Sequence, residues 1–479
     1  MADAVASADE PMSHREVLRA LTGLLAGFFA AMLSINIVVT ALPVIVRELD
    51  GTQLEYSWVL TGTLLANAAT TPIWGKLADL FDKKLLFQIA LGVFTLGSFV
   101  AGAGGTMGML IVGRVIQGVG VGGLAALTMA ILGTIIAPRE RGRYAGYMGA
   151  TMATATAAGP LIGGLLVETA GWRWTFWSGI PVALVAMLII AKTLQLAPQQ
   201  RRRVRIDWFG ATLLATATIA GMLWLSFAGN PQFFDVVSVP SAALVAVVVL
   251  GILGLIMVER RVSEPVMDPR IFRSRTTLLA IIASMTMAVL MMSIPAYLGL
   301  YFQNGRGLGP TASGLLTLPL IFGNLIGTTV TGQLITRYGR WKIYLVLGSA
   351  LGIAAAYWLA FVDDTTPFWL IGVKISLIGL GVGMVIQNLM LAVQNTVTVH
   401  HIGAASAAIA FFRTVGGALG NSVMGAVMAV HLAGAVTASQ LMDGYAAGAS
   451  PMFLAAALIA TPALVAVLLI REVPLRRTV

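Results

Sequence analysis

Long apolar runs follow one another along almost the whole chain, and they constrain the fold more than any other feature of the sequence. A helix of about 20 apolar residues crosses the hydrocarbon core of a bilayer. Fourteen runs meet this length: Ala20–Pro43, Ser57–Leu77, Leu85–Ala103, Met107–Ile136, Tyr144–Val167, Thr175–Leu196, Trp208–Ala228, Val239–Val258, Thr277–Phe302, Ala312–Ile335, Ile343–Phe361, Phe368–Val397, Ala404–Val430 and Pro451–Ile470. The sequence therefore predicts an all-α polytopic membrane protein with 14 transmembrane helices.

The composition agrees and excludes several functional classes. Charged residues make up 10% of the 479 residues, against about 25% in soluble domains. The chain has no cysteine, which excludes disulfides, thiolate metal sites and thiol nucleophiles. The four histidines form no catalytic arrangement, and no nucleotide-binding loop or metal-ligand cluster is visible. We expect no enzymatic activity, no cofactor and no metal.

The distribution of basic residues predicts the topology. Of 30 basic residues, 24 lie in the two tails and in alternate loops, whereas the opposite loops hold only Arg47, Arg173 and Arg306. Such short basic loops face the cytoplasm, which explains the net charge of +10 without a nucleic-acid partner. Both termini are predicted to be cytoplasmic, in a bacterial-type plasma (inner) membrane. The first residues lack the apolar core of a signal peptide and are expected to form a cytoplasmic tail.

An internal repeat divides the chain. A single shift of 261 residues relates two sets of small residues: Gly118, Gly120, Gly122, Gly142, Ala155 and Gly159, and Gly379, Gly381, Gly383, Gly403, Gly416 and Gly420. Repeats of this kind are typical of transporters. The expected organisation is a tail (1–19), a six-helix bundle (20–196), an insert (197–275) with helices at 207–228 and 239–258, a second six-helix bundle (276–470) and a tail (471–479).

A charged segment, Gly75–Lys84, is expected to form a tight cytoplasmic loop between the second and third runs, and a weaker copy occurs at Gly332–Lys342. Gly75 is expected to let the chain turn as it leaves the helix. Asp79 is expected to contact a helix N-terminus or the neighbouring Lys83 and Lys84, as a latch that closes the cytoplasmic face. The alternative is a solvated acid without a gating role.

Three basic residues lie inside the runs. Arg114 and Gln117, one turn apart on one helix face, are interpreted as a buried polar node for substrate or proton, or as a structural anchor. Arg413 lies near the expected midplane, and no Asp or Glu falls inside any run, so the cavity is predicted to be neutral to positive. Lys374 is predicted to share this role, or to be deprotonated or to snorkel outward.

Uncharged polar residues inside the runs suit a mostly apolar pocket with a few hydrogen-bonding points. Each one alone also fits an interhelical hydrogen bond. The candidates for the substrate cavity are Ser34, Asn36, Asn67, Asn324, Gln387, Asn388 and Asn421.

Three motifs together resemble the major facilitator superfamily, in particular its fourteen-span drug:proton antiporter branch. They are Gly75-x-Leu77-x-Asp79 with Lys83-Lys84, then Leu110-x-x-x-Arg114-x-x-Gln117-Gly118-x-Gly120, and Ala155-x-x-x-Gly159-Pro160-x-x-Gly163-Gly164. The resemblance covers essentially the whole chain. The chain departs from the family pattern at Asp82 and Ala155, where Gly is usual, and at Ser34, because many members of the branch carry a first-helix Asp in the Leu33–Asn36 segment.

The resemblance implies a proton-coupled exporter of amphipathic small molecules, in which two bundles rock around a midplane cavity. It implies that Ala155, Gly159, Pro160, Gly163 and Gly164 seal one side of that cavity, although the spacing alone fits ordinary helix packing equally well. The expected partners are protons, membrane lipid and amphipathic or lipid-like substrates, and a monomer is expected. The alternatives are a dedicated lipid or secondary-metabolite exporter, an uptake symporter, and a non-transporting receptor or scaffold.

Overall fold

The computed structural model describes residues 14–136, 141–194, 207–228, 234–262, 265, 272–308, 310–397, 402–432 and 437–474. Within these ranges the chain is helical apart from turns and one isolated bridge between Ala228 and Phe234. The elements are α1 (His14–Glu48), α2 (Gln53–Leu80), α3 (Lys83–Ala103), α4 (Met107–Ile135), α5 (Arg141–Thr169), α6 (Trp174–Trp177), α7 (Gly179–Thr193), α8 (Trp208–Phe227), α9 (Val239–Glu259), α11 (Arg275–Leu300), the π-helix η2 (Tyr301–Gly305), α12 (Pro310–Tyr338), α13 (Lys342–Leu359), α14 (Phe368–Thr396), α15 (Ile402–Leu432) and α16 (Ala438–Leu469). The predicted all-α class is confirmed.

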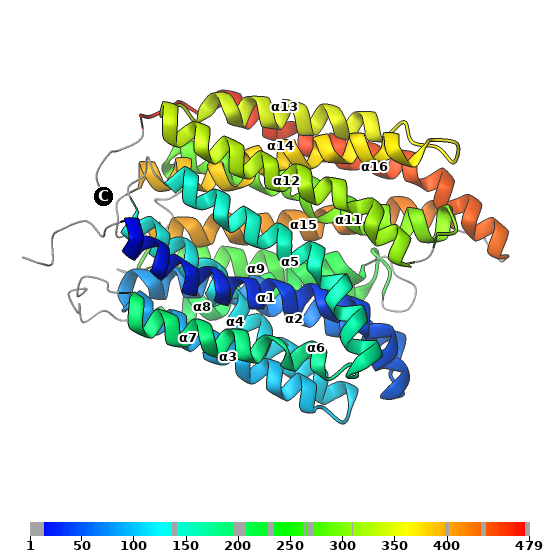
Figure 1. The fold of residues 1–479 in the computed structure, drawn as a ribbon, viewed down its shortest axis with the longest axis horizontal. Coiled ribbons are helices and arrows are strands. Elements are labelled where there is room, and N and C mark those ends of the chain that lie inside the picture. Colours follow the sequence, from blue (N-terminus) through cyan, green and yellow to red (C-terminus); the bar gives the residue numbers. More distant parts are fainter. Residues whose placement is uncertain are drawn as a thin grey trace, which may run out of the picture.

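The helices pack in two groups that lie side by side, as Figure 1 shows. In the first group, α1–α7, the main contacts join α3 to α4, α2 to α4, α1 to α5 and α1 to α7. In the second group, α11–α16, they join α12 to α14, α13 to α14, α11 to α15 and α11 to α16. Two pairs, α5 with α12 and α2 with α15, form most of the seam between the groups.

The repeated glycines make equivalent close approaches in the two groups. A Cβ atom at Gly120 on α4 would lie 2.5 Å from the backbone nitrogen of Phe94 on α3. A Cβ atom at Gly381 on α14 would likewise lie 2.5 Å from the backbone of Gly348 and Gly352 on α13. Because small residues let helix backbones approach closely, the shared spacing reflects shared packing between α3–α4 and α13–α14.

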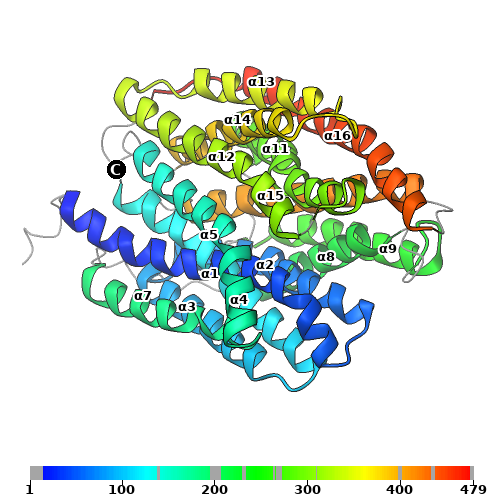
Figure 2. The ribbon, with the colours of Figure 1, turned by 45° about the vertical axis from the view of Figure 1, so that its right-hand side comes forward.

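The helix pair α8–α9 lies beside the seam, and Figure 2 shows it next to α2 and α15. Met222 on α8 packs with Leu65 of α2 and Ala418 of α15, so α8 contacts both helix groups. The Ser422 hydroxyl of α15 also donates to the carbonyl oxygen of Leu225 on α8. The outer helix α9 exposes a broad apolar surface that includes Leu250 and Met257.

Twelve helices among the described residues are long and apolar enough to cross a membrane. The two long helices outside this set are α2 and α5, of 28 and 29 residues. The protein is therefore a multi-pass membrane protein with 12 candidate spans, and the expected number of 14 stays a prediction.

Several expected boundaries are wrong. The first helix begins at His14, inside the expected tail 1–19, rather than at Ala20. The segment Gly75–Lys84 is not a loop, because α2 continues to Leu80 and α3 begins at Lys83. Asp82 caps α3 by accepting the Lys84 backbone N–H at 2.8 Å, a role that Asp fills well. The last helix begins at Ala438 rather than Pro451, since a capping box of Thr437 and Gln440 starts it before the apolar run.

Candidate functional site

Arg114, predicted to form a polar node with Gln117, is 1% exposed. Its Nε atom donates to the Val59 carbonyl oxygen of α2 at 3.3 Å, and its Nη1 atom donates to Gln117 Oε1. Thr63 of α2 donates to the Arg114 carbonyl oxygen at 3.2 Å. The acceptors of these guanidinium hydrogen bonds are therefore neutral oxygens. The bond to Val59 joins α4 to α2.

Gln117 extends the node to two further helices. Its Nε2 atom donates to the hydroxyl of Ser34 on α1 at 2.9 Å and to the hydroxyl of Ser98 on α3 at 2.8 Å. Ser34 thus belongs to the same cluster as Arg114, although sequence analysis placed it in the substrate cavity. Ser98 and Thr63 were missed because hydroxyl residues are common in membrane helices and their partners lie far away in the sequence.

Asp79, predicted to act as a latch, contacts a helix N-terminus. Asp79, near the end of α2, accepts the backbone N–H of Gly403 at 3.0 Å and that of Ala404 at 2.9 Å, at the start of α15. A helix N-terminus presents free N–H groups and favours a negative charge. Lys84 instead donates to the Ala191 carbonyl oxygen of α7 at 2.8 Å, and Lys83 is buried at the first turn of α3.

Gly75 supports this contact by close packing rather than by a turn, which corrects the expected role. It lies inside α2, and a Cβ atom there would lie 2.2 Å from the Cβ atom of Ala407 and 2.9 Å from the carbonyl oxygen of Gly403. The backbones of α2 and α15 meet at this end of the seam because Gly75 has no side chain. We call this the Asp79 end of the molecule.

The fifth-helix motif packs partly as expected. A Cβ atom at Gly159 would lie 2.4 Å from the Asn36 Cβ atom of α1, and Ala155 is buried against Leu33 and Ile37 of α1. Gly164 has no neighbour within 4 Å of such a Cβ atom, so it does not contribute to this packing. Gly163 is buried in α5, and the side chain of Pro160 lies outside what the structure describes.

The two other basic residues within the spans lie in different surroundings. Lys374 on α14 is 2% exposed, and its Nζ atom lies 5.4 Å from the ring centroid of Trp358 on α13. This cation–π contact covers the ammonium group within the second helix group. Arg413 on α15 is half-buried, and its Nε atom is enclosed without a hydrogen-bond partner.

The predicted amide residues divide into two kinds. Four bond within their own helices, and three of these are Asn36 to the Met32 carbonyl oxygen at 2.7 Å, Asn388 to that of Met384 at 2.7 Å, and Asn67 with Thr71 at 3.1 Å. Asn324 accepts from Thr328 at 3.4 Å on α12. Unpaired buried oxygens occur on the second helix group, at Gln387 Oε1, Asn388 Oδ1 and Asn421 Oδ1.

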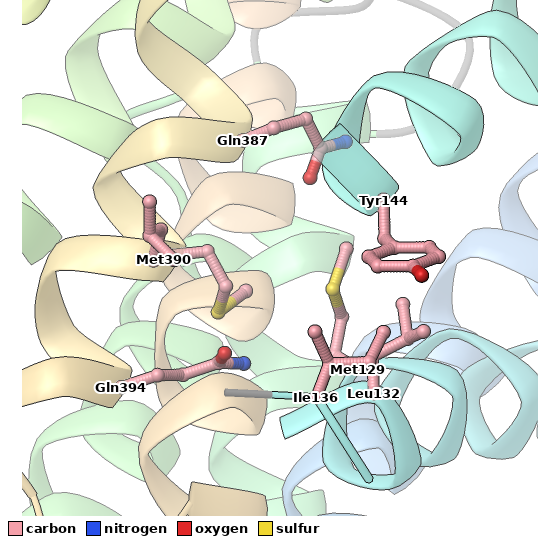
Figure 3. A pocket seen from close by; sticks show the side chains of 8 residues that line it. Met129, Leu132, Ile136, Tyr144, Gln387, Met390 and Gln394 are labelled. Carbon is pink, nitrogen blue, oxygen red and sulfur yellow. The ribbon is translucent and has the colours of Figure 1, made fainter. Parts of the chain in front are cut away.

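A pocket lies across the seam between α14 and the two helices α4 and α5 (Figure 3). Gln387 and Gln394 line it from α14, facing Met129 of α4 and Tyr144 of α5. Gln394 is held by a hydrogen bond from its Nε2 atom to the hydroxyl of Ser406 on α15, at 2.8 Å. The lining is otherwise apolar, which suits the uncharged part of an amphipathic molecule.

At the opposite end, a cluster on the turn before α14 surrounds Arg306. Its Nη1 atom donates to the Tyr301 hydroxyl at 3.1 Å and to the Asp363 carbonyl oxygen at 3.3 Å. Hydrogen bonds from the side chains of Thr366 and Thr365 lower the pKa of the exposed Asp363 carboxyl below its usual value. Asp363 therefore stays ionised near neutral pH, and it cannot act as a group that gains and loses a proton there.

Comparison with known proteins gives consistent results. Residues 24–421 match the family described as the Major Facilitator Superfamily. An uncharacterized MFS-type transporter of Mycobacterium tuberculosis is 33% identical over 480 residues, which cover 95% of this chain and 69% of the relative. The multidrug transporter protein MdtP of Bacillus subtilis is 30% identical over 422 residues, with coverages of 88% and 77%. The MFS efflux transporter aclA of Aspergillus oryzae is 32% identical over 407 residues, with coverages of 81% and 71%.

Two solved structures share the fold. The human organic anion transporter MFSD10 (TETRAN) superposes with a TM-score of 0.67 at 13% identity, covering 94% of this chain and 99% of that one. The proton:xylose symporter XylE superposes with a TM-score of 0.64 at 13% identity, covering 93% and 95%.

Proposed function

Because the chain belongs to the major facilitator superfamily, we propose that it is a secondary active exporter of amphipathic small molecules. Relatives named as multidrug and efflux transporters support export rather than uptake. In this proposal the protein works as a monomer in a bacterial-type inner membrane, with 14 spans, cytoplasmic termini and the domain boundaries expected from the repeat.

The contact between Asp79 and the N-terminus of α15 carries the mechanistic proposal. It joins the two helix groups through two hydrogen bonds at one end of the seam. Rocking of the groups would break both bonds together, so the contact suits a two-state gate. We assign it to the cytoplasmic face, closed in this conformation, because the adjacent turn carries Lys83 and Lys84.

Proton antiport is part of the proposal, with Arg114 and Gln117 as the polar node that moves with the rocking groups. Ser34 cannot titrate, and its hydroxyl accepts a hydrogen bond from the Gln117 amide. Coupling through the first helix is therefore not proposed. Lys374 is the remaining candidate inside the spans, because a lysine deprived of water can release its proton.

A dedicated exporter of lipids or secondary metabolites is the second candidate. The inserted pair favours it, because α9 exposes a continuous apolar surface on the outside of the molecule. A receptor or scaffold would have no need of the Asp79 contact or of the buried Arg114 node.

Counterflow in proteoliposomes tests the proposal. The purified chain is supplied with a panel of amphipathic drugs and fluorescent lipids, with and without an imposed pH gradient. Transport of the drugs that depends on the gradient supports the proposed exporter. Movement of lipids alone supports the second candidate, and no movement of any compound contradicts both.

A further inference from the structure

Buried polar side chains in the two helix groups include paired and unpaired atoms. In the first group, Arg114, Gln117 and Ser34 bond to one another. In the second group, Gln387 Oε1 and Arg413 Nε are enclosed without partners. Buried polar atoms in native proteins are almost always paired, so an unpaired donor and an unpaired acceptor require an explanation.

The hydrogen bond between Gln394 and Ser406 relates the positions of these two side chains. Gln387 precedes Gln394 by seven residues on α14, and Arg413 follows Ser406 by seven residues on α15. Seven residues are about two helical turns, which return a side chain to the same face about 10 Å further along the axis. Since α14 and α15 run in opposite directions, Gln387 and Arg413 are displaced from that bond toward the same end of the molecule.

The surroundings of this pair suit an anionic ligand. Residues 368–432, which include α14 and α15, contain no Asp or Glu to neutralise Arg413. Gln387 is 8% exposed and faces α4 and α5 across the pocket in Figure 3, where Met129 and Met390 provide apolar surface. Lys374 is unsuited to this role, because the ring of Trp358 covers its ammonium group.

We propose that Arg413 and Gln387 form a subsite for the head group of an amphipathic organic anion. Arg413 donates to a carboxylate, and Gln387 Oε1 accepts from a hydroxyl or N–H group next to it. The apolar body of the ligand lies against the methionines of the seam. This inference rests on the proposed function, since it names the substrate class of the same transporter.

A matched pair of fluorescent probes tests the subsite: an N-dansyl amino acid with a long apolar side chain, and its methyl ester. Binding to the purified full chain is measured by fluorescence titration. Because the ester lacks the carboxylate, Arg413→Gln is expected to raise the Kd of the acid about tenfold or more and to leave the Kd of the ester unchanged. Arg306→Gln, which removes a positive charge outside the subsite, is expected to change neither value.

A second measurement tests the subsite even if the Arg413→Gln variant cannot be purified. The natural chain has no cysteine, so Gln387→Cys introduces a single thiol. The acid is expected to slow its reaction with a maleimide several-fold more than the ester does. Equal protection by the two probes, or an equal loss of acid and ester binding in Arg413→Gln, would overturn the subsite. Either result would leave the proposed export of neutral drugs unaffected. If the chain binds the acid selectively but exports none of the compounds, the proposed function fails and the subsite does not.

Discussion

Asp79 on α2 accepts the backbone N–H of Gly403 on α15 at 3.0 Å, although 324 residues separate them in the sequence. The carboxylate crosses the seam between the two helix groups and contacts the first turn of a helix that begins at Ile402. Separation of the groups at this end would therefore expose free N–H groups and a charged carboxylate at the same time.

We first predict that Asp79→Asn opens the Asp79 end of the seam. A charge-assisted hydrogen bond contributes about 1.5–3 kcal/mol, so weakening this contact should shift the equilibrium toward the open state by about tenfold or more. The measurement is the maleimide labelling rate of Ile402→Cys, a buried position against Gly133 of α4, in inside-out vesicles.

Asp82→Asn is the matched control for this change. Asp82 lies on the same turn but caps α3, where its carboxylate accepts the backbone N–H groups of Lys84 and Leu85. Its substitution should leave the labelling rate of Ile402→Cys unchanged. A similar acceleration in both variants would mean that the charge of the turn, and not the contact with α15, keeps this end closed.

The second prediction concerns the close approach at Gly75. Gly75→Ala places a methyl group 2.2 Å from the Cβ atom of Ala407, so the seam must separate to accommodate it. Overpacking of this kind costs about 1–3 kcal/mol. Efflux should fall several-fold. The control is Gly92→Ala on α3, where an added Cβ atom meets nothing within 4 Å. Full activity of Gly75→Ala would contradict the tight seam.

The third prediction concerns topology. If α2 and α5 also span the membrane, a short epitope inserted after Gly105, an exposed residue between α3 and α4, should be accessible from outside the cell, because this turn would face the cytoplasm if α2 did not span. An epitope at Val479 should be accessible only after the membrane is opened. Detection of both epitopes on the same side would contradict the 14-span arrangement.

Local sequence patterns predicted the inserted helices closely but not the contacts between the helix groups. The expected ranges 207–228 and 239–258 differ by one residue at most from Trp208–Phe227 and Val239–Glu259, because long apolar runs mark such helices directly. The start of α16 was missed because its first turns are polar. The bonds from Asp79 to Gly403 and from Gln117 to Ser34 join residues distant in sequence, and helical periodicity says nothing about such pairs.

The fourth prediction separates function from anchoring in the buried node. Arg114→Leu removes the guanidinium group and leaves Gln117 Oε1 without its donor, at a cost of about 1–3 kcal/mol for an unpaired buried group. We expect efflux to be abolished while the variant still purifies as a monodisperse species. Lysine should restore efflux poorly, because it lacks the planar donor fork. Thr63→Val removes the hydroxyl bonds to the Arg114 and Val59 carbonyl oxygens but keeps the guanidinium group, so it should retain efflux. Aggregation of Arg114→Leu would favour a purely structural anchor.

The last prediction concerns coupling at the position where many related antiporters carry an acid. Ser34 accepts one of two hydrogen bonds from Gln117, and Ser98 accepts the other, so Ser34→Ala leaves the amide with a partner. Since a hydroxyl does not titrate near neutral pH, its loss should not change how efflux depends on a pH gradient. The measurement is flux in proteoliposomes with and without the gradient, for wild type, Ser34→Ala and Lys374→Ala. Uncoupling by Ser34→Ala alone would place the proton path through the first helix after all. A wild-type flux that ignores the gradient would instead replace antiport with facilitated export.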